Sequence, residues 1–117
     1  MTKYHSRKTV VNGIPFDSRL EAARYQQLRL LEKADEITSL QLQVEFQILR
    51  GWINPETGEK IKSRNYIADF VYIDNATNKL IVEDTKGIET PEFRLKWSLV
   101  KSLYPQFEFR KVKREDM

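Results

Sequence analysis

Residues 66–86 decide the fold of this chain, and they read YIADFVYIDNATNKLIVEDTK. Two runs rich in Ile, Val, Tyr and Phe flank a polar DNATN segment, a pattern typical of an antiparallel hairpin. With the turn centred in that segment, Val71 faces Val82 across the two strands. Asp69 then faces Asp84, at the end of a face that is otherwise apolar.

The two facing carboxylates require a positive partner. Burying their charges without one costs several kcal/mol, roughly, because like charges repel and lose their hydration. Lys86 follows Asp84 on the same strand face, and two interpretations stay open. Either Lys86 alone bridges Asp69 and Asp84 as a buried structural triad, or the carboxylates hold a divalent cation and Lys86 supplies charge for chemistry on a phosphate.

A short ribbon and a helix precede this hairpin. Asn12-Gly13 separates two apolar runs, which predicts a tight type I′ turn. Ser18 and Glu21 have the spacing of a capping box, so we expect a helix from there to about residue 34. Its apolar stripe is expected to comprise Leu20, Ala23, Leu30, Leu31 and Ala34. Two interpretations of Glu21 are equally good locally: its carboxylate caps the helix, or it joins the two aspartates.

Alternation of apolar and polar residues over 39–50 predicts a long, half-buried strand. The residues expected to share its buried face are Leu40, Leu42, Val44, Phe46 and Ile48. Turn residues at 54–58 return the chain to the hairpin, giving a three-strand antiparallel meander. Gln43 is a lesser candidate for lining the site and is better explained as a hydrogen-bonding residue at a strand edge.

A second helix and a final strand complete the predicted fold. Thr90-Pro91 predicts the helix start, and residues 106–112 predict the strand. The apolar stripe of this helix is Phe93, Trp97, Val100 and Tyr104. The fold class is therefore α/β, with a central mixed sheet flanked by two helices. The first helix is expected to cover the hairpin face that carries Ile67, Val71, Leu80 and Val82, and Glu83 is assigned to solvent or a salt bridge on the other face.

Composition bounds the domain count and the chemistry. Of 117 residues, 40% are hydrophobic and 32% charged, which predicts one domain over 1–117 with flexible ends at about 1–8 and 113–117. No apolar run approaches the roughly 18 residues of a membrane span, so we expect a cytoplasmic protein with no membrane association. With no Cys and one His, any metal must be bound by oxygen, which favours Mg²⁺, with Mn²⁺ as a substitute.

The basic residues are clustered, although the net charge is only +3. One cluster is at the start of the chain, and another, Lys60, Lys62 and Arg64, precedes the hairpin. Solvated charged faces explain such clusters as readily as nucleic acid does. The candidate phosphate contacts lie on the second predicted helix and near the end of the chain, and they are Arg94, Lys96, Lys101, Arg110, Lys111 and Lys113.

The motifs, taken together and in order, resemble those of the PD-(D/E)XK nuclease superfamily. They are Phe16-Asp17-Ser18-x-x-Glu21-Ala22, Leu42-Gln43, Tyr66-Ile67-Ala68-Asp69-Phe70 and Val82-Glu83-Asp84-Thr85-Lys86-Gly87. The chain is most similar to small phage and prophage endonucleases related to transposon end-cutting endonucleases and Holliday-junction resolvases. It departs from their pattern at Ala68 and Val44, where relatives carry Pro, and neither position is a ligand.

The resemblance implies a restriction-endonuclease-like core and a Mg²⁺-dependent DNA endonuclease that hydrolyses phosphodiester bonds. It implies that Asp69, Asp84, Lys86 and Glu21 are catalytic, and that Glu21, Asp69 and Asp84 hold the metal. It further implies a phage or mobile-element protein that acts in DNA recombination or processing in the cytoplasm of a bacterial host cell. Its partner would be DNA. It would form a homodimer or bind a phage recombination protein.

Two alternatives remain open beside that function. In the first, the chain is a non-catalytic nucleic-acid-binding module, its carboxylate cluster is structural and its basic residues contact phosphates. In the second, it is a cleavage subunit that is active only within a larger recombination or transposition complex.

Overall fold

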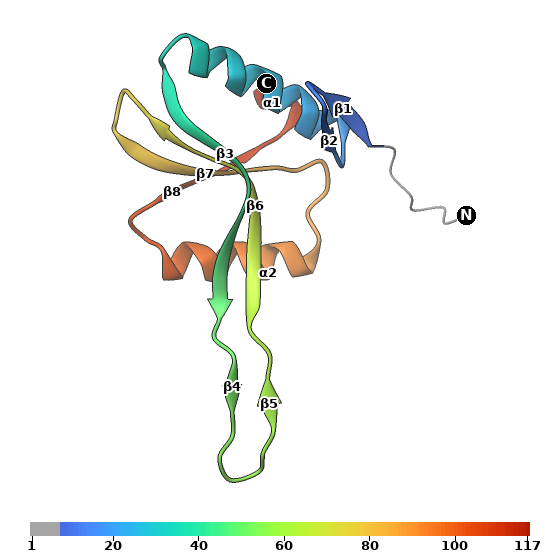
Figure 1. Ribbon diagram of the computed structural model, residues 1–117, viewed down its shortest axis with the longest axis vertical. Coiled ribbons are helices and arrows are strands. Elements are labelled where there is room, and N and C mark those ends of the chain that lie inside the picture. Colours follow the sequence, from blue (N-terminus) through green and yellow to red (C-terminus); the bar gives the residue numbers. More distant parts are fainter. Residues whose placement is uncertain (1–7) are drawn as a thin grey trace, which may run out of the picture.

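A mixed four-stranded sheet in the order β3-β6-β7-β8 forms the centre of the molecule (Figure 1). In the computed structural model, which describes residues 8–117, these strands are β3 (Ile37–Leu49), β6 (Arg64–Asp74), β7 (Lys79–Thr85) and β8 (Glu108–Val112). β3, β6 and β7 pair antiparallel in succession, and β8 runs parallel to β7. The predicted α/β fold, a three-strand antiparallel meander plus a final strand, is confirmed.

Two helices and two small ribbons complete the fold. They are α1 (Arg19–Lys33), α2 (Pro91–Leu103), the ribbon of β1 (Thr9–Val11) and β2 (Ile14–Phe16), and the ribbon of β4 (Trp52–Ile53) and β5 (Lys60–Ile61). At the end expected to be flexible, a short 3-10 helix, η1, covers Arg114–Asp116. The flexibility expected at the start of the chain falls almost wholly outside the described residues. No helix within residues 8–117 is long and apolar enough to span a bilayer.

Local signals placed the turns and helix starts correctly. Asn12 and Gly13 have φ values of 53° and 78°, as a type I′ turn requires. The Ser18 side chain accepts a hydrogen bond from the Glu21 backbone N–H at 3.1 Å, and Thr90 caps α2 in the same way. Because each cap satisfies a backbone donor that the helix itself leaves unpaired, each fixes the residue at which its helix begins.

The predicted hairpin register is confirmed. Val71 pairs with Val82 and Phe70 with Glu83, which brings Asp69 and Asp84 to facing positions just beyond the regular ladder. The two carboxylates contact each other. One end of the β6–β7 hairpin is therefore where both aspartates lie.

The prediction that α1 covers the face of Ile67, Val71, Leu80 and Val82 is wrong. Val71 and Val82 belong to a core built with α2, around Phe93, Trp97 and Val100, whereas Ile67 is 48% exposed. α1 packs on the opposite face, with Phe70, Tyr72 and Ile81. The reason is topological: β7, α2 and β8 form a parallel crossover, whose handedness is nearly invariant in proteins and selects the face that α2 covers.

The predicted single buried face of β3 is also wrong, because the strand changes faces at Gln43. Leu40 and Leu42 pack against the α1 core, whereas Val44, Phe46 and Ile48 pack in the α2 core. Gln43 has φ of 52°, in the left-handed region that reverses the side-chain direction. Its opposite residue is Asp69, since Leu42 pairs with Phe70 and Val44 with Ala68. Asp69 consequently lies where the two cores meet.

The apolar stripe of α1 is rotated from the predicted one. Its buried residues are Glu21, Ala22, Tyr25 and Leu28, and Leu30 is 66% exposed. The β1–β2 ribbon accounts for this rotation, because Phe16 packs on Tyr25 with their ring centroids 4.9 Å apart. The rotation turns Glu21 inward, toward the aspartates.

Candidate active site

Asp69 lies at the centre of a cluster of acidic side chains. Its Oδ2 atom accepts hydrogen bonds from the Thr85 backbone N–H at 2.9 Å and from the Thr85 hydroxyl at 2.8 Å. Glu21 from α1 and Asp84 from β7 both contact it. The structure thus brings together three carboxylates whose positions in the sequence span 63 residues.

Asp84 is buried, with 2% of its surface exposed. Its Oδ2 atom accepts a hydrogen bond from the Tyr66 hydroxyl, a group that stays protonated because burial and the neighbouring Asp84 raise its pKa. Lys86 Nζ forms an ion pair with Oδ1 at 3.2 Å, but Oδ1 has no hydrogen-bond partner. A buried carboxylate oxygen without a hydrogen bond is costly, and an oxygen of this kind is a suitable ligand for a hard cation.

Glu21 contacts both the entry to α1 and an aspartate, but the described bonds do not include the one from the Ser18 backbone that a capping box requires. Its Oε2 atom accepts a hydrogen bond from the Asp17 backbone N–H at 3.3 Å, which stabilises the entry to α1. Its Oε1 atom accepts one from Gln43 Nε2 at 3.5 Å, and the same carboxylate contacts Asp69. Gln43, a lesser candidate from the sequence, therefore reaches the site from the point where β3 changes faces.

The electrostatics of the three carboxylates are coupled. Burial, followed by contact with Asp69, raises the pKa of Glu21 to about 8, and the same two causes raise the pKa of Asp84 to about 7. Burial also acts to raise the pKa of Asp69, but hydrogen bonds from Glu21, Asp84 and Thr85 outweigh it and the pKa of Asp69 is lowered. Near neutral pH the cluster therefore retains protons that a bound cation would displace.

Lys86 contacts one aspartate, not both. Its side chain is 28% exposed, forms its ion pair with Asp84 and lies over the Phe93 ring, with Nζ 4.3 Å from the ring centroid. The described residues include no ion pair between Lys86 and Asp69. A structural triad bridged by Lys86 is therefore not what the structure contains.

The carboxylates meet as two contacting pairs that share Asp69. Within residues 8–117, no three Asp, Glu or His side chains converge closely enough to form a ready-made metal-binding group. The donors are nevertheless all carboxylate oxygens, the ligands that Mg²⁺ and Mn²⁺ prefer, and one of them is buried without a hydrogen-bond partner. By donor chemistry, the carboxylates of Asp69 and Asp84 are suited to a hard divalent cation.

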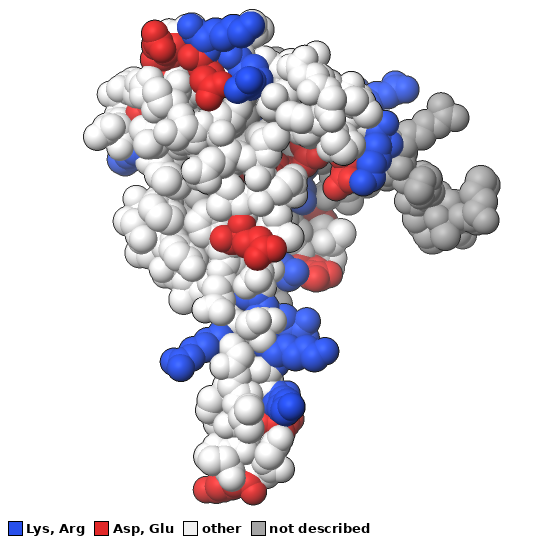
Figure 2. Space-filling view, viewed as in Figure 1, with Lys and Arg blue, Asp and Glu red and all other residues white. Residues whose placement is uncertain are grey.

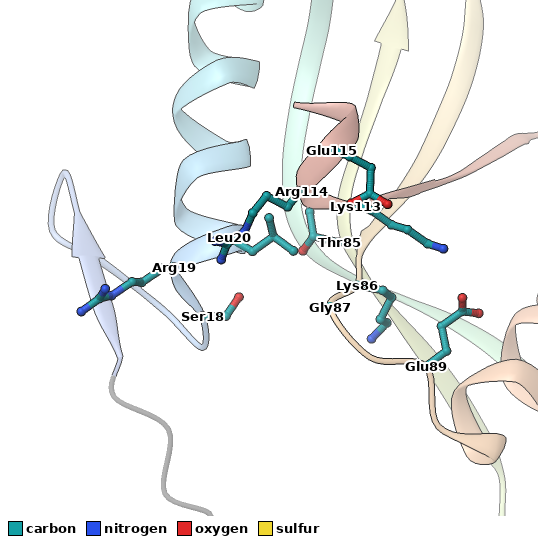
Figure 3. A pocket seen from close by; sticks show the side chains of 10 residues that line it. All are labelled: Ser18, Arg19, Leu20, Thr85, Lys86, Gly87, Glu89, Lys113, Arg114 and Glu115. Atoms are coloured by element: carbon teal, nitrogen blue, oxygen red, sulfur yellow. The ribbon is translucent and has the colours of Figure 1, made fainter.

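Two hollows lie beside Lys86, and Asp84 lines one of them. A hollow of about 550 Å³ lies between the first turn of α1, the segment from Thr85 to Gly87, and η1 (Figure 3). Basic side chains contribute much of its lining, since it is bordered by Arg19, Lys86, Lys113 and Arg114. A second hollow, of about 270 Å³, lies on the α2 side and is lined by Asp84, Lys86 and Lys96 among others. The first hollow is also lined by Glu89 and Glu115, which leaves it an excess of basic residues. In the second hollow, Lys86 is paired with Asp84 and Lys96 with Glu92.

A family model described as "Protein of unknown function (DUF1064)" matches residues 1–115. The chain belongs to this family. The match includes all four candidate catalytic residues, Glu21, Asp69, Asp84 and Lys86. Neither the comparison with curated proteins nor that with solved structures gives a match. The DUF1064 description assigns no activity to the family.

The six candidate phosphate contacts of this DUF1064 protein do not form one surface. Lys96 lines the hollow beside Asp84 and Lys86, and Lys113 lines the hollow of Figure 3. Lys111 forms an ion pair with Glu89 at 3.0 Å. Lys96 and Lys113 therefore line the hollows beside the site, and Lys111 is linked to one of them through Glu89.

The other three candidate phosphate contacts lie away from those hollows. Arg94 and Lys101 are seven residues apart in α2, which puts them on one flank of the helix, away from the Lys96 flank. Lys101 lines a separate hollow with Lys79. Arg110 is paired with Glu108 at 2.5 Å and Asp74 at 3.6 Å, on the side of the sheet where Tyr72 and α1 lie.

Glu83, assigned from sequence to solvent or a salt bridge, forms a buried salt bridge. Its carboxylate is fully buried and binds Arg24 through Nε at 2.7 Å and Nη2 at 2.8 Å. The Tyr72 hydroxyl donates a further hydrogen bond at 2.8 Å. Arg24 thus forms a structural ion pair with Glu83.

Sequence analysis missed two site residues, Tyr66 and Thr85. Both lie inside the motif segments, one at the start of Tyr66-Ile67-Ala68-Asp69 and the other between Asp84 and Lys86. Their hydroxyls each bond one aspartate. The available signal was that both motif segments contain a hydroxyl side chain near an aspartate. The carboxylate oxygen that each hydroxyl bonds depends on the twist of the strands.

Proposed function

We propose that this DUF1064 protein is a metal-dependent DNA endonuclease of the PD-(D/E)XK type that hydrolyses phosphodiester bonds. We propose further that it is of phage or mobile-element origin and acts in DNA recombination or processing. The observation that carries the proposal is the chain of carboxylate contacts from Glu21 on α1 through Asp69 on β6 to Asp84 at the end of β7, with Lys86 paired to Asp84. Burying three acidic groups together is costly unless a cation occupies the site.

Each residue of the cluster has a role in that reaction. Asp69 and Asp84 would hold Mg²⁺, and Glu21 would complete the site or bind a second ion. A divalent cation bound there would supply positive charge to the phosphate and lower the pKa of a coordinated water. Lys86, held over the Phe93 ring, would orient the attacking water or neutralise charge that develops on a phosphate oxygen.

The flanking residues support this arrangement. Tyr66 and Thr85 orient Asp84 and Asp69 through hydrogen bonds, which fixes the carboxylate planes as hydrogen bonds around metal ligands usually do. Lys96, Lys113 and Arg114 line the two hollows that open beside Lys86. Their charges would hold the DNA backbone without reading its sequence.

A second candidate is a non-catalytic nucleic-acid-binding module, and the surroundings of Asp84 are what favour it. The Tyr66 hydrogen bond and the Lys86 ion pair give Asp84 two structural contacts. If those contacts suffice, the cluster stabilises the fold and binds no metal. A cleavage subunit that needs a larger recombination complex would look the same in isolation but would still bind metal.

The deciding experiment is a cleavage panel with purified protein. Holliday junctions, flaps, nicked duplexes and linear duplexes are incubated with Mg²⁺, Mn²⁺ or EDTA. Wild type is expected to cut at least one of them only with metal, and Asp84→Asn to cut none, because an amide cannot hold the ion. Asp35→Asn is the matched control, since Asp35 is exposed and follows the far end of α1.

Calorimetric titration with Mg²⁺ and Mn²⁺ separates the remaining outcomes. Metal heat that disappears in Asp84→Asn, without cleavage by the isolated chain, would assign the protein to a larger cleavage complex. DNA binding without metal heat would establish the binding module instead. Cleavage that survives in Asp84→Asn would exclude this cluster as the active site.

A further inference from the structure

A two-stranded arm projects from the body of the protein, and nothing in the function proposed above uses it. It comprises residues 50–64 and includes β4 and β5, which pair through Trp52 with Ile61 and Ile53 with Lys60. In Figure 1 it extends away from both helices as a continuation of β3 and β6. No residue of the arm belongs to either hydrophobic core. An isolated two-stranded hairpin is marginally stable at best in water. The arm therefore contributes little to the folding stability of the protein.

The arm carries an excess of positive charge without counter-ions. The arm contains four basic residues and only two acidic ones, Glu56 and Glu59. The basic residues are Arg50, Lys60, Lys62 and Arg64, all exposed, and none forms a salt bridge with another described residue. Figure 2 shows basic side chains gathered around the base of the arm and acidic ones at its tip. Charge of this kind fits a polyanion.

The arm also exposes apolar side chains that the fold does not need. Trp52 is 53% exposed and the adjacent Ile53 is 59% exposed. They lie on opposite faces of the ribbon, because neighbouring strand residues alternate. Large apolar side chains next to unpaired cations are typical of ribbons that lie in a groove of duplex DNA, where the cations contact the phosphates on either side.

The arm is continuous with the candidate active site. β6 begins at Arg64, at the base of the arm, and runs directly to Asp69. The hollow that contains Asp84, Lys86 and Lys96 is also bordered by Asn65. At about 3.4 Å per strand residue, Arg64 lies up to roughly 17 Å and the arm tip up to roughly 40 Å from Asp69. That reach is close to one turn of duplex DNA, roughly 34 Å.

We propose that the β4–β5 arm binds duplex DNA about one helical turn to the side of the bond presented to the carboxylate cluster. Lys60, Lys62 and Arg64 contact the backbone phosphates, and Trp52 lies in the groove. The choice of DNA as the partner rests on the proposed function. The arm would set the length of duplex that the protein requires, whereas the cluster would perform the chemistry.

Fluorescence anisotropy of a labelled duplex of about three helical turns tests the arm, in EDTA and over a range of salt concentrations. Each phosphate contact contributes roughly 0.9 to the slope of log affinity against log salt. The Lys60→Ala, Lys62→Ala double variant should therefore lower the slope by about 1.8 and weaken binding about tenfold. Trp52→Ala should weaken binding with the slope unchanged. The matched control is Lys33→Ala, Lys79→Ala, which removes two exposed lysines at the opposite end of the molecule.

Because the assay contains no divalent metal, it is independent of cleavage. Arm-dependent binding by a protein that neither cuts DNA nor binds metal would support the arm and contradict the proposed nuclease. A Lys60→Ala, Lys62→Ala variant with the wild-type salt slope would overturn the proposed role of the arm. A wild-type protein that does not bind duplex DNA in EDTA would overturn it as well. Sedimentation velocity without DNA gives one further outcome: a dimer that Trp52→Ala dissociates would show that a second copy of the chain covers the arm, and would overturn the proposal.

Discussion

Glu83 and Asp84 are neighbours on β7 and are buried to almost the same extent, with exposures of 0% and 2%. Glu83, on the α1 face, is fully matched by two bonds from Arg24 and one from Tyr72. Asp84, on the α2 face, instead contacts a second carboxylate and keeps one oxygen without a hydrogen-bond partner. Burial therefore does not separate a structural carboxylate from a candidate functional one. The difference lies in how fully the protein compensates the charge, because Asp84 has one ion pair, with Lys86 at 3.2 Å, and also contacts the carboxylate of Asp69.

The strongest test of this comparison is the loss of activity in Asp84→Asn. We expect metal-dependent cleavage to fall by at least about a thousandfold, because a neutral amide cannot replace the charge that holds the cation. In EDTA the variant should be at least as stable as wild type, since it removes repulsion with Asp69. Thermal melts with and without Mg²⁺ measure the second part. Marked destabilisation in EDTA, together with surviving cleavage, would make Asp84 structural like Glu83.

Lys86→Ala sharpens the contrast within the site. We expect the cleavage rate to fall by about a hundredfold or more. The affinity for metal should stay near that of wild type, because the carboxylates remain. Calorimetry with Mn²⁺ measures the binding and the DNA panel measures the turnover. Loss of metal heat in this variant would contradict the separation of roles between Asp84 and Lys86.

Glu83→Gln probes the other side of the comparison. The variant leaves Arg24, whose side chain is only 15% exposed, without its counter-charge, so it should lose about 3 kcal/mol of folding free energy. Urea unfolding followed by circular dichroism measures the loss. Cleavage per folded molecule should be unchanged, and a stable but inactive Glu83→Gln protein would move Glu83 into the site.

The pH dependence of stability should reflect Glu21 and Asp84. Their pKa values in the folded protein, about 8 and about 7, lie above the ordinary carboxyl range. The folded state therefore holds more protons than the unfolded state, and this stabilising contribution is complete below about pH 4 and is lost as the pH rises through about 7 to 8. Asp69, whose pKa is lowered, contributes in the opposite sense, as its stabilisation is lost only when the pH falls through its own pKa.

Urea titrations in EDTA between about pH 5 and 9 measure this dependence. Wild type should lose stability across the range, and Glu21→Gln should lose less. A Glu21→Gln protein with the full wild-type slope would show that Glu21 is not buried against Asp69.

The smallest expected effect concerns the two flanks of α2. The Lys96→Ala, Lys101→Ala double variant should lower the salt slope of DNA binding by roughly 0.9 for each lysine that contacts a phosphate. The single variants decide which flank does so. Lys96 borders the site hollow, so we expect the change from Lys96→Ala, and an unchanged slope in the double variant would assign both lysines to a solvated helix face.

The local parts of the fold could be predicted because their causes are local. The type I′ turn at Asn12-Gly13, the Ser18 and Thr90 caps and the hairpin register at Val71 and Val82 all depend on residues a few positions apart or on one strand pair. The pairing of Asp69 with Asp84 followed from that register. These features needed no knowledge of the rest of the chain.

By itself, then, the sequence determined the order of elements, the sheet pattern and the identity of four candidate catalytic residues. Tertiary structure alone decided which helix covers which face, since the crossover from β7 through α2 to β8 is set by handedness and not by hydrophobic pattern. It also decided that Glu21 points inward, that the side chains of β3 change faces at Gln43, and that Arg24 is the ion-pair partner of Glu83. Periodicity indicates which residues share a face only while the element stays regular, as β3 does not at Gln43. The partner of a buried charge depends on contacts between residues as far apart as 24 and 83.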